Sequence, residues 1–266
     1  MLVNARMYSV TPAATAAWKT LFDWVLARAG VKGEWFSHDA PKPISALWAR
    51  DDLACVQMCG LPFSLREPKA TLLAAPVPSL PDYAGRSVYW SYIAVKAESP
   101  YRKLEDTFGK TAGYTVKDSQ SGYFAFRHHL MQRSPGKTPY SKIVGGLINP
   151  RGVVSALVDG RIDVGPLDSY VFDLIRAGDP AFAAQVRIID TTDPTPMPPV
   201  IATSPALTAD AIQRLREAFA AAGTEPVLAE ARKALLVSKF ILPDPASFNV
   251  QKQRHDQVVA GGEDWP

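Results

Sequence analysis

Cysteine and histidine are scarce in this sequence. Its 266 residues include two cysteines and four histidines. Cys55 and Cys59 have no histidine or further cysteine near them, which excludes the common zinc patterns and a disulfide framework. His128 and His129 are adjacent, so they cannot share one face of a helix. We therefore expect no metal site, and we interpret both cysteines as buried structural thiols.

The motifs of several common enzyme classes are also missing. The sequence has no Gly-x-Ser-x-Gly elbow, no Walker loop and no Gly-x-Gly-x-x-Gly fingerprint. Cys59 follows a predicted strand and could in principle act as a nucleophile, but no histidine is placed by the sequence to activate it. The absence of a catalytic set favours a non-enzymatic binding protein that needs no cofactor.

Charge is nearly balanced, and apolar runs are short. The net charge is +3, and the composition of 47% hydrophobic and 21% charged residues is typical of a globular protein. Such a charge suits a small anionic ligand, whereas nucleic acid usually requires a basic stripe. No apolar run approaches the ~18 residues of a membrane span, and residues 1–10 show no secretory signal. We expect a chain that neither binds nucleic acid nor spans a membrane, and that is either cytoplasmic or shown without a leader.

The sequence does contain a repeated alternation of strand and helix patterns. A helix is expected from Thr11, with Pro12 at its first position, to Gly30. The apolar run 53–58 is typical of a strand that is covered on both faces. Further strands are predicted at 5–10, 33–37, 71–75, 87–96, 111–116, 142–145, 163–167 and 186–191, and further helices at 44–50, after 62, and at 122–132, 150–158 and 169–176. This order predicts two α/β units with parallel sheets.

Two extended stretches would connect these units. They are residues 87–96, which carry Trp90 and Tyr92, and the proline-rich residues 193–199, which lead into a last strand at 200–203. Helices at 208–222 and 224–236, the second burying Val227, would return the chain to the first unit. We predict two three-layer α/β lobes joined by two crossing strands, with a ligand cleft between them. Lobe 1 would comprise residues 1–92 and 200–266, and lobe 2 residues 93–199.

A polar turn at residues 119–123 is the main candidate for a ligand site. It follows a strand and opens a helix, so backbone N–H groups and the positive end of the helix dipole would favour an anion there. Each of these residues also has a structural interpretation: Ser119 as a simple N-cap, Asp168 as a helix cap, Gly60 as a turn and Tyr8 as a core residue. The candidate ligand-binding residues at this turn and at the other strand ends are Tyr8, Ser9, Cys59, Gly60, Trp90, Tyr92, Ser119, Gln120, Ser121, Gly122, Tyr123 and Asp168.

Several stretches match one known family in order. They are residues 5–8 (Ala-Arg-Met-Tyr), 53–65, 92–103 with Ser-Pro before basic residues, 104–116, the Ser-Gln-Ser-Gly of 119–122, 154–169 and the proline-rich 196–200. Together they resemble the solute-binding proteins of phosphate, phosphite and phosphonate ABC transporters, which have the type II periplasmic-binding fold. The resemblance implies a periplasmic protein that delivers a small anionic solute to an ABC permease.

The same resemblance implies roles for particular residues. Ser119, Gln120 and Ser121 would hold an oxyanion, while Tyr8, Tyr92 and Asp168 would line the rest of the site, with Asp168 facing any cationic end of the ligand. The sequence departs from the family at Gln120, where threonine is common, and at Asn149, a further candidate ligand-binding residue, where the family often has histidine. Cys59-Gly60 also differs from the usual pair. The alternatives are a cytoplasmic ligand sensor, and an enzyme or binder for a thiamine or pyrimidine precursor on the same scaffold.

Overall fold

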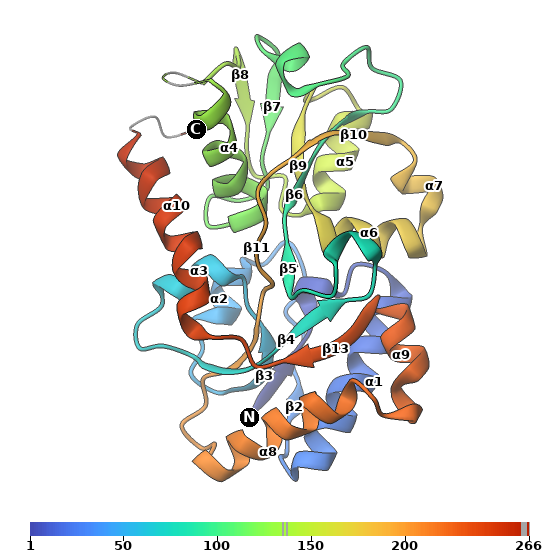
Figure 1. Ribbon diagram of the computed structural model, residues 1–266, viewed down its shortest axis with the longest axis vertical. Helices are drawn as coiled ribbons and strands as arrows, with labels where there is room; N and C mark the ends of the chain where they lie inside the picture. The colour runs from blue at the N-terminus through green and yellow to red at the C-terminus, as the bar shows by residue number, and fades with distance from the viewer. Residues whose placement is uncertain (135, 137, 262–264, 266) are drawn as a thin grey trace. The chain divides into compact units, whose positions relative to one another are not determined.

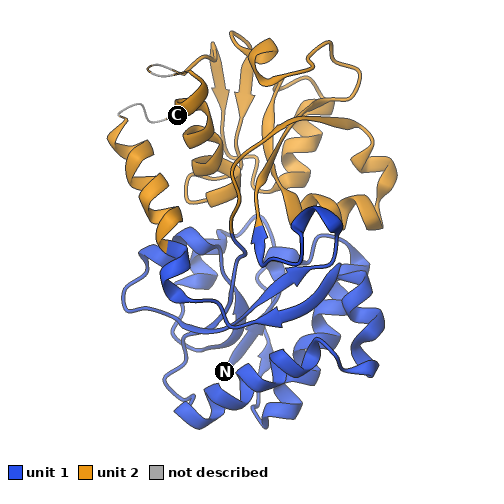
Figure 2. Cartoon of the chain, in the orientation of Figure 1, with its two compact units in different colours: residues 1–88, 196–248 blue, residues 89–195, 249–266 orange. Residues whose placement is uncertain are grey.

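The chain folds into two compact units, each built from discontinuous segments. The computed structural model describes residues 1–134, 136, 138–261 and 265 (Figure 1). Unit 1 comprises Met1–Val88 and Pro196–Phe248, and unit 2 comprises Tyr89–Thr195 and Asn249–Pro266 (Figure 2). The chain therefore passes from one unit to the other three times, whereas the sequence predicted two passages.

Unit 1 contains a six-stranded mixed sheet in the order β13-β4-β12-β3-β1-β2. Strand β1 pairs in parallel with both β2 and β3, whereas β12 is antiparallel to β3 and to β4, and β13 is antiparallel to β4. Strands β1 to β4 thus run in one direction, as predicted for a parallel sheet, whereas β12 and β13 of the returning segment run the other way. The bounds are β1 Leu2–Asn4, β2 Glu34–Trp35, β3 Leu53–Gln57, β4 Thr71–Pro78, β12 Val200–Ala202 and β13 Val237–Ile241.

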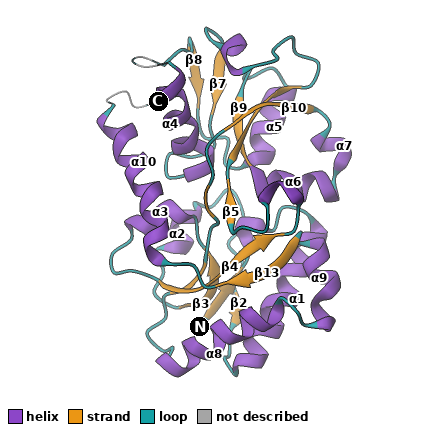
Figure 3. Ribbon diagram, viewed as in Figure 1, coloured by secondary structure: helices purple, strands orange, loops and turns teal. Residues whose placement is uncertain are grey.

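Two sets of helices pack on this sheet (Figure 3). In the first set, α1 contacts α8 and α9, and its Trp18 ring packs against Phe22 and Phe240. In the second set, Leu47 and Phe63 join a core cluster with strand residues such as Val56. The bounds in the first set are α1 Pro12–Ala29, α8 Ala209–Ala222, η5 Pro226–Leu228 and α9 Ala229–Ala234; in the second, α2 Ile44–Trp48, α3 Gly60–Leu65 and η6 Pro245–Phe248; η1 Arg6–Tyr8 and η2 Pro81–Tyr83 are short 3-10 turns.

Unit 2 has smaller sheets than unit 1. An antiparallel sheet has the order β10-β6-β9, and β7 pairs in parallel with β8. A bridge between Ala112 and Val164 links β7 to the residues before β9. The strands within unit 2 are β6 Ser91–Lys96, β7 Thr111–Gly113, β8 Lys142–Val144, β9 Gly165–Asp168 and β10 Val186–Thr191, while β5 Val88–Tyr89 and β11 Thr195–Pro196 each include a point where the chain passes from one unit to the other. The helices are η3 Leu104–Thr107, η4 Gln120–Phe124, α4 Ala125–Arg133, α5 Pro150–Val158, α6 Ser169–Gly178, α7 Pro180–Ala183 and α10 Asn249–Ala260.

The structure corrects the predicted element bounds at several places. Residues 5–10 do not form a strand, because the carbonyl group of Ala5 accepts hydrogen bonds from the backbone of Tyr8 and Ser9 and turns the chain. Strand β4 continues beyond the predicted end at residue 75 to Pro78, and the predicted strand 87–96 is divided at Trp90. Val227 is 69% exposed, because Pro226 starts a 3-10 turn that presents it to solvent.

The C-terminal segment differs most from the prediction. Strand β13 and helix α10 were not expected, and residues 249–266 were assigned to lobe 1. Helix α10 instead packs against α4 and η4, so this segment groups with unit 2. Within the part of the chain that is described, no helix is both long enough and apolar enough to cross a membrane.

Candidate ligand-binding site

The polar turn at residues 119–123 opens a continuous helical segment in unit 2. Its first five residues form a π-helix, η4, which continues directly into α4. The hydroxyl oxygen of Ser119 accepts a hydrogen bond from the N–H group of Gly122 at 2.9 Å, as an N-cap does. In the first backbone hydrogen bond of this helix, the N–H group of Phe124 donates to the carbonyl group of Ser119 at 3.1 Å. The helix itself therefore supplies no acceptor for the N–H groups of Gln120 and Ser121.

Gly122 holds this turn against the end of β7. A Cβ atom at this position would lie 1.9 Å from the hydroxyl oxygen of Thr115. The carbonyl group of Gly122 also accepts a hydrogen bond from the N–H group of Thr115 at 3.2 Å. Only glycine permits such a close approach, so the position of the turn is set by contact with a neighbouring backbone.

Asp168 connects the turn to the end of strand β9. Its carboxylate caps α6 by accepting from the N–H group of Val171 at 2.9 Å, and it accepts from the Ser121 hydroxyl at 3.2 Å. The Ser91 hydroxyl in turn donates to the carbonyl group of Ser121 at 2.7 Å. Burial raises the pKa of Asp168 to about 7, and the nearby Asp173 carboxylate acts in the same direction. Near neutral pH this carboxyl group can therefore either donate or accept a hydrogen bond.

Gln120 is the candidate whose side chain stands out. It is 1% exposed, and neither Oε1 nor Nε2 of its amide has a hydrogen-bond partner among the described residues. Buried polar groups in native proteins are almost always bonded, so such an amide indicates a ligand or a bound water. A local cap would not require it, because Ser119 already provides the cap.

The aromatic candidates of unit 2 have structural contacts of their own. The Tyr92 hydroxyl donates to Asp173 at 3.4 Å, and its ring packs at 6.0 Å against that of Trp90. The ring of Tyr123 packs against those of Tyr114 and Phe124, with centroids 4.8 and 5.0 Å away, so its side chain is engaged in packing. 

Asn149 caps α5 on a neighbouring loop. Its side-chain oxygen accepts a hydrogen bond from the N–H group of Gly152 at 3.0 Å. The N–H group of the preceding residue, Ile148, donates to the carbonyl group of Thr115.

The remaining candidates belong to unit 1. Tyr8 is fully buried on η1 and its ring stacks on Trp18 at 6.4 Å. The Ser9 hydroxyl donates to the carbonyl of Ala5, which is a local contact. Cys59 and Gly60 lie at the start of α3. Both cysteines of the chain are buried, as predicted, and neither forms a disulfide.

Sequence reasoning missed Gln57, the last residue of β3. It is 1% exposed, and both polar atoms of its side chain lack a partner within the described ranges. The available signal was a single polar residue at the end of an otherwise apolar strand.

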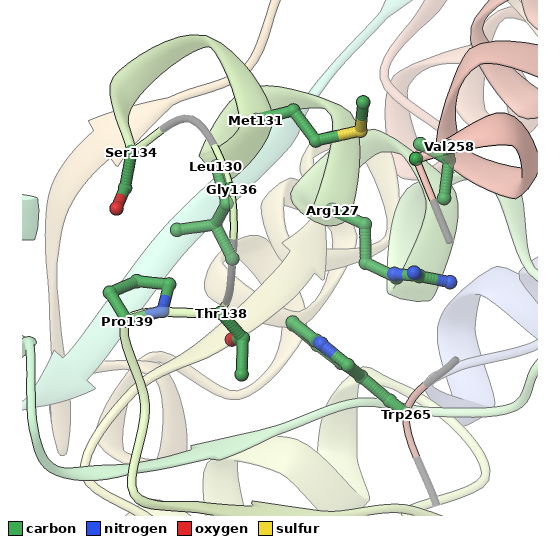
Figure 4. Close-up of a pocket in the computed structure, with 10 residues that line it drawn as sticks. Arg127, Leu130, Met131, Ser134, Gly136, Thr138, Pro139, Val258 and Trp265 are labelled. Carbon is green, nitrogen blue, oxygen red and sulfur yellow. The ribbon is translucent and has the colours of Figure 1, made fainter. Parts of the chain in front are cut away.

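A hollow in unit 2 is a weaker candidate for the ligand site. It is lined by α4, by residues near Pro139 and by the C-terminal segment, with Arg127 and Trp265 at its side (Figure 4). The Arg127 guanidinium lies over the rings of Tyr123 and Trp265, 5.2 and 5.7 Å from their centroids, so it is already engaged in packing. In the described portion of the chain, no three His, Cys, Asp or Glu side chains are placed to hold a metal ion.

Comparison with known proteins gives one family and many related folds. Residues 9–248 match the model of the family described as "ABC transporter, phosphonate, periplasmic substrate-binding protein". No curated protein sequence matches the chain.

Three solved structures illustrate the shared fold. A binding-protein component of an ABC phosphonate transporter from Pseudomonas aeruginosa is similar with a TM-score of 0.80 at 16% identity, covering 98% of this chain and 87% of that one. PhnD1 from Prochlorococcus marinus, in complex with methylphosphonate, has a TM-score of 0.80 at 13% identity and coverages of 97% and 98%. A Xanthomonas citri protein bound to ATP has a TM-score of 0.70 at 21% identity, with 99% of each chain covered. These likenesses confirm the predicted two-lobed α/β fold of periplasmic binding proteins.

Proposed function

Because the chain belongs to the family of periplasmic substrate-binding proteins of phosphonate ABC transporters, we propose that its solute is a small oxyanion of the phosphonate, phosphite or phosphate type. The family binds solutes for uptake and is not an enzyme class. We assign the oxyanion to the turn at residues 119–123 of unit 2. We further propose that its partner is an ABC permease and that it is periplasmic, because the family implies both.

The buried, unpartnered amide of Gln120 is the observation that carries this assignment. Its Nε2 group would donate to an oxyanion oxygen, together with the N–H groups of Gln120 and Ser121 at the positive end of the helix. Each hydrogen bond to a charged oxygen contributes roughly 1.5–3 kcal/mol. Three such donors would together contribute roughly 4.5–9 kcal/mol, a large share of the ~8 kcal/mol that a micromolar Kd represents.

Asp168 would select for the remainder of the solute. In its protonated form it donates a hydrogen bond, and as a carboxylate it accepts one from a P–OH or an ammonium group. With its pKa at about 7, both forms exist at neutral pH. A solute with a hydroxyl or ammonium group can therefore bond either form of Asp168, whereas one that offers only acceptors can bond the protonated form alone.

Calorimetric titration of the purified protein tests this assignment. We expect methylphosphonate, phosphite or phosphate to bind with one site per chain, and methanesulfonate to bind more weakly. Gln120→Met keeps the volume of the side chain but removes its amide, so it should weaken binding of the best oxyanion about tenfold or more. Gln132→Met is the matched control, since Gln132 is exposed on α4 in the same unit.

Two results would contradict the assignment. Failure of all three phosphorus oxyanions to bind would exclude the proposed solute class. Equal affinities of the wild type and the Gln120→Met variant would show that the Gln120 amide does not hold the solute and would remove the observation on which the assignment rests.

A further inference from the structure

The π-helix η4 in unit 2 has an uncommon hydrogen-bond register. The N–H group of Phe124 donates to the carbonyl group of Ser119, five residues earlier. The N–H group of Ala125 donates in the same way to the carbonyl group of Gln120. An α-helix joins residues four apart, and π-turns are rare and are frequently found at functional sites. Because the α register is the default, contacts from outside the helix must hold this one.

Neighbouring strands of the same unit fix the middle of the turn. The Ser91 hydroxyl of β6 donates to the carbonyl group of Ser121 at 2.7 Å. The N–H group of Thr115, beyond the end of β7, donates to the carbonyl group of Gly122 at 3.2 Å. These two bonds support the turn from the side of the sheets.

The end of η4 is covered by residues 249–261 and Trp265, which we call the C-terminal arm. The His255 ring of α10 lies 4.6 Å from the ring of Phe124, measured between centroids. The Trp265 ring lies 5.8 Å from that of Tyr123, and its backbone N–H group donates to the Tyr123 hydroxyl at 3.4 Å. Because Tyr123 and Phe124 are both buried, the arm packs directly on the last two residues of the π-helix.

Helix α10, the main part of the arm, is docked beside α4 by polar contacts (Figure 1). The side-chain oxygen of Gln257 lies 2.8 Å from Nε2 of His128 on α4. The Arg254 guanidinium donates to two carbonyl groups of the loop after β10, at 3.3 and 3.4 Å. Its buried side chains are Gln251 and Val258. A helix held in this way detaches at a lower free-energy cost than the unfolding of the whole unit.

We propose that the C-terminal arm positions the anion-binding turn by holding the π-helical register of η4. This inference rests on the proposed function, which places the oxyanion at that turn. When the arm detaches, η4 relaxes toward the α register, the N–H groups of Gln120 and Ser121 change direction, and the oxyanion is bound more weakly. His255 is thus a positioning residue that acts through Phe124.

The test compares His255→Ala with His255→Phe and with Val259→Ala. The first variant removes the ring next to Phe124, and the second keeps an aromatic ring there while losing the contact of the imidazole with Asp256 at 3.0 Å. The third is the control, because Val259 is 59% exposed on the same helix. Hydrogen exchange measured by NMR reports on the amides of Phe124 and Ala125, which form the π-type bonds. Amides of the central strand β6 serve as the internal reference.

The expected effect is local to the π-helix. In His255→Ala the amides of Phe124 and Ala125 should exchange about tenfold faster than in the wild type, while exchange in β6 stays unchanged. The Kd for methylphosphonate, measured by calorimetry, should become about 3- to 10-fold weaker. His255→Phe should restore most of both values, and Val259→Ala should change neither.

Three results overturn the inference. Unchanged exchange at Phe124 in His255→Ala would mean that the arm does not hold the register. Faster exchange that is equal in β6 would mean that His255 contributes only to general packing. Faster local exchange with an unchanged Kd would mean that the register does not govern binding. If the wild type binds no phosphorus oxyanion, the proposed function fails separately, and faster local exchange then still supports the arm's hold on the register, whereas unchanged exchange overturns it.

Discussion

Replacing Asp168 with asparagine should flatten the dependence of stability on pH. Asparagine keeps the size of the side chain and can still accept the hydrogen bond from Val171 that caps α6. It removes the group whose pKa is raised by burial to about 7. The variant therefore separates the titration of this carboxyl group from its role in the fold.

The sign and size of the effect follow from the raised pKa. Below about pH 4 the folded and unfolded chains both hold the proton, so the carboxyl group adds no pH dependence. Between pH 4 and 7 only the folded chain holds it, and the free energy of unfolding falls by about 1.4 kcal/mol per pH unit. From the usual 3.8 to about 7 the loss sums to about 4 kcal/mol, and above pH 7 it stays constant.

Urea unfolding of both proteins from pH 4 to 8 measures this difference. The Asp168→Asn variant should gain stability relative to the wild type as pH rises, and the gain should level off above pH 7. Asp82→Asn serves as the control because Asp82 is exposed and carries the same charge. If the curves of the wild type and Asp168→Asn run parallel over this range, the buried carboxyl group does not titrate as described.

Two further predictions concern the contact that holds the turn in place. Gly122→Ala should lower the free energy of unfolding by about 1–3 kcal/mol in urea titrations, because its Cβ would lie 1.9 Å from the Thr115 hydroxyl oxygen; wild-type stability would show that the turn can move. Thr115→Ala should recover part of this loss in the Gly122→Ala background, since it removes the opposing hydroxyl; an additive double variant would contradict the proposed contact.

Elements with local end signals were predicted well from the sequence. Helix α1 begins after Thr11, whose hydroxyl accepts from Ala14, and ends at Gly30 in the left-handed conformation. Helix α5 likewise has the predicted bounds, because Asn149 caps it and Pro150 starts it. In these cases the residues that start or stop the helix are adjacent in sequence, so no tertiary information is needed.

Elements that depend on distant contacts were missed. Strand β13 has only five residues, of which Val237 and Phe240 are buried, and it is completed by pairing with β4. Helix α10 is largely polar and is held by packing on α4. The break at Trp90 depends on Ser169, whose hydroxyl accepts from the Trp90 N–H group at 3.2 Å.

The candidate site shows the same division between local and distant information. The cap at Ser119 could be predicted from the order of strand, turn and helix. The bond from Ser121 to Asp168 joins residues 47 positions apart, and the missing partners of Gln57 and Gln120 are visible only in three dimensions. The interlobe cleft and the ligand roles of individual residues stay predictions.

A crystal structure of the protein with methylphosphonate tests the central claim most directly. We predict that phosphonate oxygens lie about 2.7–3.2 Å from the backbone nitrogen atoms of Gln120 and Ser121 and from the side-chain Nε2 atom of Gln120. A phosphonate bound elsewhere, with the Gln120 amide still unbonded or bonded only to water, would contradict it.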